Sequence, residues 1–312
     1  MLNVNELTKQ TKAACAPASL SSIKSVNKVA FSLNGKSIYV VSGAAVETVS
    51  ALDISSGKVK AEKSSRTIIS LVPVEEGVLL ATNHTLELWN FQLSVCVCKW
   101  SNIPKVCYVI PLSEVLVACV HYESRGVTFL NTTSGEIVSR MHCSVDELVA
   151  CNRKCQVITI KNSNSLLLLD GQAILWCKNM PYRFSSARGC FSPAEQFFVL
   201  LFQSAHVLEV VSGRTLHILH VCKDERPYIC KFLNDEVCAI CSGESRRHHF
   251  IRLFNVKSGD QLTVIDMESR VISLDTNPRN QLIAIGVQQS KYNFKLIQVK
   301  LPGNKEIRKS PR

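Results

Sequence analysis

The amino-acid sequence predicts an all-β protein made of seven similar units of four strands each. Short runs rich in Val, Ile, Leu and Phe alternate with turns of Gly, Asn, Ser and Pro, and no segment keeps the 3.6-residue periodicity of a helix. The chain has 312 residues, of which 46% are hydrophobic and 20% charged, so it can bury a large core. Similar strands recur about every 40 residues, and this recurrence indicates a repeat architecture.

The first strand of each unit is an apolar run that leads into a turn and a second apolar strand. Such pairs are typical of β-hairpins. The predicted first strands begin at Val26, Arg66, Lys105, Val145, Ala187, Tyr228 and Val271. Seven copies fit the chain and leave only a short segment at each end.

The third strand of each unit gives an independent register, because in six copies it ends in an acid or an amide. The end positions are Asp53, Asn90, Asn131, Asp170, Glu209, Asn255 and Val299. They lie 37 to 46 residues apart, with a mean spacing of 41. Glycine, which tolerates the positive φ of a tight turn, stands four residues beyond five of them. Ser94 and Ile174 take its place in the second and fourth units.

A period near 40 residues with four strands per unit is typical of the blades of a β-propeller. One blade cannot bury both of its faces alone, whereas seven blades around an axis bury each face against a neighbour. This arrangement explains why the strands are almost continuously apolar instead of alternating. The sequence therefore predicts a single seven-bladed β-propeller of four-stranded antiparallel blades over residues 27–303.

Three segments resemble the WD-repeat family. The segment TLELWN at residues 85–90 is similar to the third strand of that family, with Asn90 where Asp is usual. VAFSLNG at residues 29–35 and LDISSG at residues 52–57 follow the family's first-strand and turn patterns. The usual Gly-His pair is missing, and one repeat keeps Trp, so the sequence resembles a divergent member. The resemblance implies a propeller that acts as a protein-interaction scaffold.

The two ends of the chain have different predicted roles. Segment 1–26 either supplies a strand that closes the ring, with residues 2–7 as the candidate, or is a linker from a larger parent protein. Segment 304–312 is a basic tail that we expect to be solvated.

The composition also predicts the compartment. The longest apolar run, residues 197–202, is far shorter than the roughly 20 residues that a membrane-spanning helix needs. The N-terminus lacks the pattern of a secretory signal, so we expect a cytoplasmic protein without a membrane partner. The fourteen cysteines are then expected to be reduced and mostly buried.

No motif for catalysis stands out. The sequence has no phosphate-binding loop, no Gly-x-Ser-x-Gly and no metalloprotease His-Glu pair, so it predicts a non-enzymatic protein without cofactor or metal. Cys238 and Cys241 lie on one predicted strand, where residues three apart point to opposite faces. Cys151 and Cys155 flank a predicted turn whose Arg and Lys would favour a thiolate, although two unpaired thiols fit as well.

Positive charge is predicted to gather on one face. The chain carries a net charge of +11. In a WD-type propeller the loops from the fourth strand of one blade to the first of the next share the top face with the loops between second and third strands. Sorting charges by this map gives +7 for the top and zero for the bottom. Tyr and Trp side chains accompany the basic loops, and Arg with aromatic residues is typical of protein interfaces.

The leading prediction is a recognition propeller whose basic top face binds an acidic or phosphorylated segment of another protein. The candidate partner-binding residues are Arg66, Trp100, Lys105, Tyr122, Arg125, Tyr182, Arg183, Arg188, Arg226, Arg246, Arg247, Arg270 and Tyr292. We expect either a monomeric propeller or a part of a larger assembly.

Two alternatives remain open at this stage. The same basic face with its aromatic residues suits RNA, because bases stack on aromatic rings while Arg neutralises phosphates. In the other alternative the basic face is merely solvated and partners bind elsewhere. The loop with His248 and His249 follows Arg246 and Arg247, a neighbourhood that disfavours a metal cation, so it is predicted to be basic surface.

Overall fold

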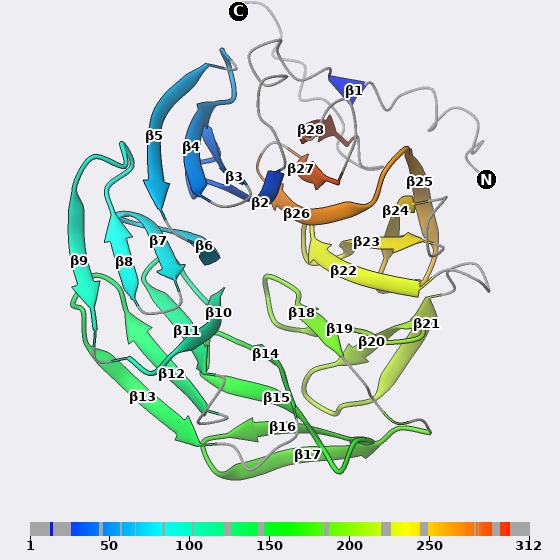
Figure 1. The fold of residues 1–312 in the computed structure, drawn as a ribbon. Coiled ribbons are helices and arrows are strands. Elements are labelled where there is room, and N and C mark those ends of the chain that lie inside the picture. The colour runs from blue at the N-terminus through cyan, green and yellow to red at the C-terminus, as the bar shows by residue number, and fades with distance from the viewer. Residues whose placement is uncertain are drawn as a thin grey trace, which may run out of the picture.

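A computed structural model describes residues 13–14, 26–43, 46–56, 58–65, 67–82, 85–101, 103–121, 126–142, 147–181, 183, 187–219, 226–243, 249–277, 279, 281–288 and 294–299. Within these ranges, seven four-stranded antiparallel sheets form a ring around a central axis (Figure 1). The structure therefore confirms the predicted seven-bladed β-propeller.

The first strand of each blade lies innermost in the ring and the fourth lies outermost (Figure 1). The first strands are β2 (Val26–Phe31), β6 (Ile68–Val74), β10 (Val106–Pro111), β14 (Glu147–Cys151), β18 (Arg188–Phe191), β22 (Arg226–Phe232) and β26 (Val271–Asn277). The second strands are β3 (Ser37–Ser42), β7 (Gly77–Thr82), β11 (Leu116–His121), β15 (Gln156–Lys161), β19 (Phe197–Leu201), β23 (Val237–Gly243) and β27 (Leu282–Val287). The third strands are β4 (Glu47–Asp53), β8 (Leu86–Trp89), β12 (Gly126–Asn131), β16 (Ser165–Asp170), β20 (Ala205–Glu209), β24 (His249–Asn255) and β28 (Phe294–Gln298). The outermost strands are β5 (Val59–Ser65), β9 (Cys96–Trp100), β13 (Ile137–His142), β17 (Ala173–Asn179), β21 (Thr215–Leu219), β25 (Gln261–Met267) and β1 (Ala13–Ala14).

The turns after the third strands follow the predicted glycine pattern in part. Gly135, Gly213 and Gly259 have φ between 65° and 78°, as expected for tight turns. In the second blade Leu93 takes the positive φ, one residue before the expected Ser94. In the fourth blade the turn is shorter, and Gly171 adopts a φ of 58° three residues before Ile174.

The N-terminal segment supplies the outermost strand of the last blade. Strand β1 pairs with β28 in antiparallel register, with Ala13 opposite Ile297 and Ala14 opposite Leu296. The candidate closing strand at residues 2–7 and the basic tail 304–312 lie outside the described residues. An N-terminal strand therefore completes a sheet whose other three strands come from residues 271–298.

The hydrophobic core lies between the blades. In β11, β19 and β23 nearly every residue is buried, because both faces of each sheet pack against a neighbouring blade. The outermost strands differ: β9, β13 and β17 leave most of their side chains exposed. This contrast explains the almost continuous apolar runs of the second strands.

Side chains tie the innermost strands of neighbouring blades together. The Ser273 hydroxyl and the Asp275 carboxylate of β26 accept hydrogen bonds from the backbone N–H groups of Val29 and Phe31 in β2, at 3.0 and 2.8 Å. The Ser70 hydroxyl makes a similar 3.2 Å contact with the Val109 N–H. In each case a side chain of one blade accepts a hydrogen bond from a backbone N–H group of the neighbouring blade. These bonds satisfy the N–H groups and fix one blade against the next.

Two buried histidines predict a loss of stability in acid. The Nε2 atom of His121 lies 2.7 Å from the Thr128 hydroxyl, and burial lowers the pKa of His121 below its ordinary value of 6.5. The unfolded chain then binds a proton before the folded chain does, so stability is complete above about pH 6.5 and declines below it. Because burial also lowers the pKa of His206, His121→Gln should reduce this slope without abolishing it. Urea unfolding midpoints on both sides of pH 6.5 measure the slope, and an unchanged slope in the variant would contradict the assignment.

Candidate functional site

The innermost strands all begin at the same rim of the ring, and several predicted site residues lie there. Arg188 and Arg226 are the first residues of β18 and β22, and Arg270 directly precedes β26. Lys105 directly precedes β10, in the third blade, and Arg183 lies in the connection that leads to β18. All five side chains are exposed. The strand directions therefore bring these five basic residues to one face.

Two of the arginines contact Tyr228 in β22, and a third lies on the same strand. The Arg188 guanidinium donates a 3.3 Å hydrogen bond to the Tyr228 carbonyl oxygen. The Arg270 guanidinium lies over the Tyr228 ring, 5.5 Å from its centroid, in a cation–π contact. Arg226 stands two residues before Tyr228 on the same strand. We call Arg188, Arg226 and Arg270 the arginine cluster.

The arginine cluster carries positive charge that other described residues do not neutralise. Among the described residues, none of its three guanidinium groups forms an ion pair with a carboxylate. The Tyr228 ring also meets His249 edge to face, with 6.5 Å between ring centroids. Burial raises the pKa of the Tyr228 phenol, so the ring stays neutral at physiological pH. Tyr228 is thus a neutral, packed support between positive groups.

A cavity of about 870 Å³ runs beside the innermost strands of the third to seventh blades. Arg188 and Tyr228 line it near the rim where these strands begin, and Arg153 lines it in the turn where β14 ends. Lys231 and Asp275 face each other in the cavity wall, with 3.7 Å between the ammonium nitrogen and the carboxylate oxygen. Arg188 therefore links the arginine cluster to a cavity whose wall is mostly apolar and contains the Lys231–Asp275 pair.

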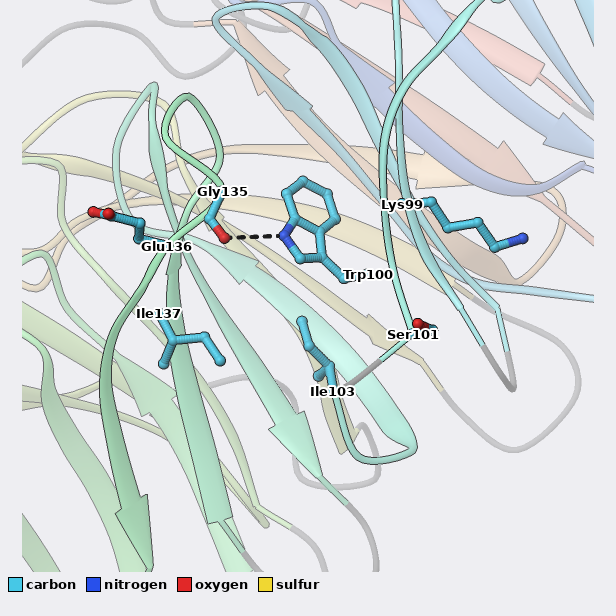
Figure 2. A pocket seen from close by; sticks show the side chains of 7 residues that line it. All are labelled: Lys99, Trp100, Ser101, Ile103, Gly135, Glu136 and Ile137. Carbon is cyan, nitrogen blue, oxygen red and sulfur yellow. Dashed lines mark hydrogen bonds between the residues drawn. The ribbon is translucent and has the colours of Figure 1, made fainter.

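Trp100 lies elsewhere, on the outer wall of the ring. It ends β9, and its indole N–H donates a 3.1 Å hydrogen bond to the carbonyl oxygen of Gly135 in the next blade (Figure 2). This contact lies in a pocket of about 540 Å³ lined by Lys99, Trp100, Ser101, Ile103, Gly135, Glu136 and Ile137. The neighbouring Lys99 is paired with Glu87 at 3.0 Å. The structure thus separates Trp100 from the arginines with which the sequence grouped it.

The other candidates that the sequence assigns to the top face are outside the ranges that the structure describes. They are Arg66, Tyr122, Arg125, Tyr182, Arg246, Arg247 and Tyr292, and His248 is also outside these ranges. His249 is described, and it is a buried residue at the start of β24.

The predicted cysteine pairs behave as structural thiols. Cys238 packs between the fifth and sixth blades and Cys241 between the sixth and seventh, which confirms that they point to opposite faces of β23. Cys151 and Cys155 flank a turn between β14 and β15, as expected. Burial and the Asp170 carboxylate raise the pKa of Cys155, so the nearby basic residues do not stabilise its thiolate. In the described part of the chain, no group of three or more His, Cys, Asp and Glu residues could hold a metal ion.

Sequence reasoning missed three residues of the cavity wall. Tyr228 organises the arginine cluster, and the thiols of Cys190 and Cys230 meet 3.1 Å apart between β18 and β22. One signal was present: the two cysteines stand one repeat length apart, each on a predicted first strand. Their contact crosses two sheets, which a search for local motifs does not test.

The comparisons with known proteins bear on the fold alone. The β-propeller domain of Cps50 (Swd1) from Myceliophteria thermophila superposes with a TM-score of 0.70 and 12% sequence identity, over 93% of this chain and 100% of that domain. No family model matches the sequence, and no curated protein matches it. No helix of the described residues has the length and hydrophobicity that crossing a bilayer requires. At this level of identity the similarity shows a shared fold: the chain is a seven-bladed β-propeller, and its fold is similar to that of the Swd1 β-propeller domain.

Proposed function

We propose that this chain is a non-enzymatic recognition propeller of the WD-repeat type that binds an acidic or phosphorylated segment of another protein. The observation that carries the proposal is the arginine cluster at the rim where the innermost strands begin, with Arg188 lining the central cavity. Its three guanidinium groups are exposed, and among the described residues none is paired with a carboxylate. We further propose that it works in the cytoplasm, in keeping with its composition.

The chemistry of the cluster suits carboxylate and phosphate groups. Arg presents a planar array of N–H donors that forms paired hydrogen bonds to either anion. Arg188 is held by the Tyr228 carbonyl oxygen and Arg270 by the Tyr228 ring, so less side-chain entropy is lost when a ligand binds. Lys105 and Arg183 extend the positive charge along the same rim.

The same geometry favours a peptide over RNA. Sequence-tolerant RNA binding uses exposed aromatic faces on which bases stack. Tyr228 is the aromatic ring within the cluster, and Arg270 and His249 already contact it. Trp100 lies in the outer wall, where Gly135 accepts its indole N–H. The described part of the rim therefore supports anion binding more than base stacking.

A charge reversal tests the proposal. The variant Arg188→Glu/Arg226→Glu/Arg270→Glu should bind a fluorescent glutamate-rich or phosphoserine peptide at least tenfold more weakly than the wild type. The loss follows because hydrogen bonds between charged groups contribute about 1.5–3 kcal/mol each. Fluorescence anisotropy measures the affinities, with a neutral peptide and a single-stranded RNA as comparison probes.

A matched variant separates the cluster from the overall charge. Lys154→Glu/Arg214→Glu/Arg279→Glu changes the net charge by the same amount at exposed positions in turns of the opposite rim. It should keep the wild-type affinity for the acidic peptides. Equal losses in both variants would mean non-specific attraction, and tight binding of RNA alone would favour a nucleic-acid ligand. Capture of partners from nuclease-treated extract with each variant extends the test to natural ligands.

A further inference from the structure

Two free thiols of neighbouring blades meet in the wall of the central cavity. Cys190 lies in β18 and Cys230 in β22, and their sulfur atoms are 3.1 Å apart. A disulfide bond is about 2.05 Å long, so the two sulfurs are roughly 1 Å from bonding distance. Forty residues separate the cysteines in the chain, and each belongs to a different sheet.

The pair is open to small molecules through the cavity. Cys190 is half-buried, and both cysteines line the cavity of about 870 Å³. Among the described residues, the buried Cys151 also lines this cavity, in β14, whereas the buried thiols of Cys119 and Cys241 do not. Cys119 is enclosed between the second and third blades and Cys241 between the sixth and seventh.

The surroundings of Cys190 also favour its reactive form. Burial opposes ionisation of the thiol, but hydrogen bonds from the Cys230 and Cys238 thiols and the nearby Lys231 ammonium hold the pKa of Cys190 well below its usual range. By contrast, burial raises the pKa of Cys119 to about 12. The thiolate is the nucleophile in thiol oxidation, so Cys190 is the member of the pair that reacts first.

We propose that Cys190 and Cys230 form an oxidation site, at which a hydroperoxide converts the two thiols into a disulfide that joins β18 to β22. The Cys190 thiolate attacks one oxygen of hydrogen peroxide, the O–O bond breaks, and a sulfenic acid and hydroxide form. The Cys230 thiol then attacks this sulfur, the S–O bond breaks, and water leaves as the S–S bond forms. In sum, two thiols and one peroxide give one disulfide and two waters. Two equivalents of a small thiol such as glutathione reverse the reaction and become the oxidised dimer.

Peptide mapping of the full-length, folded chain tests the site directly. After treatment with a small excess of hydrogen peroxide and alkylation, trypsin releases residues 189–214 with Cys190 as their single cysteine, and residues 224–231 with Cys230. We expect these two peptides as one cross-linked species, lighter by two hydrogen atoms than their sum. Dithiothreitol should separate them.

Two variants identify the order of the steps. In Cys230→Ala the sulfenic acid on Cys190 has no resolving thiol, so dimedone should label peptide 189–214 several-fold more than in the wild type. In the matched control Cys119→Ala, which removes an enclosed thiol from β11, the cross-link should form as in the wild type. Circular dichroism confirms that each variant is folded.

Three results would overturn the proposal. One is the absence of the cross-linked peptide from folded, oxidised wild type while other cysteines have reacted. Another is a dominant pairing of either cysteine with the exposed Cys96 or Cys177, and the third is a cross-link that appears only after unfolding. Peptide mapping of the wild-type protein tests the cross-link without any substitution. Poor folding of a variant therefore does not affect this test.

Discussion

Phe198→Ala is expected to lower the free energy of unfolding by about 3–5 kcal/mol, the usual range for removing a fully buried aromatic side chain. Phe198 lies in β19 with 0% of its surface exposed, in the core between the fourth and fifth blades. Its ring packs 5.0 Å from that of Phe191 and fills the space beside Gly189, where a Cβ atom would lie 2.2 Å from the ring. Alanine leaves a cavity that rigid strands on both sides cannot close.

Guanidinium unfolding curves followed by circular dichroism measure this loss. Phe91, a turn residue with 39% of its surface exposed, is the matched control, and Phe91→Ala should change the free energy of unfolding by less than about 1 kcal/mol. Phe198→Leu should cost less than Phe198→Ala because it refills part of the cavity. Equal small effects at positions 91 and 198 would mean that the interface between the two blades contributes little to stability.

The repeat was predictable because the physics that forms a blade is local. Each first strand is a short apolar run, and six of the seven third strands were predicted to end at an acid or an amide, so the seven-blade repeat follows from the sequence alone. The closing strand was not predictable in this way. Ala13–Ala14 is two residues long, and its role depends on the free edge that β28 offers from the other end of the chain.

The positions of the candidate site residues were predictable only where they follow from strand direction. Arg188, Arg226 and Arg270 stand at the starts of innermost strands, so the register alone places them at one rim. Trp100 ends an outermost strand, and successive strands of a sheet rotate by roughly 20–25° each. Over a four-stranded blade this twist turns β9 along the ring (Figure 1). The end of β9 thereby meets the next blade, where Trp100 contacts Gly135 (Figure 2). The sequence-based assignment of residues to the two faces treats every strand as parallel to the axis of the ring. Such an assignment does not include that rotation.

Asp275→Ala is expected to cost about 2–3 kcal/mol, because Asp275 joins three blades at the place where the ring closes. Its carboxylate accepts a 2.8 Å hydrogen bond from the N–H of the buried Phe31 in the first blade. It also faces the Lys231 ammonium of the sixth blade at 3.7 Å. Hydrogen bonds to charged groups contribute about 1.5–3 kcal/mol, while the half-exposed Lys231 adds little through a screened ion pair.

The neighbouring Ser273 supplies the comparison that identifies the charge as the cause. Its hydroxyl accepts the 3.0 Å hydrogen bond from Val29 N–H between the same two strands, but as a neutral group. Ser273→Ala should therefore cost only about 1 kcal/mol, and Asp275→Asn, which keeps an acceptor oxygen, should fall between the two alanine variants. In Asp275→Ala, hydrogen exchange at the Phe31 amide should become faster than in Ser273→Ala. If the two alanine variants were equally stable, closure of the ring would rest on the apolar packing between β26 and β2 and on the pairing of β1 with β28, and the carboxylate would only fill space beside the cavity.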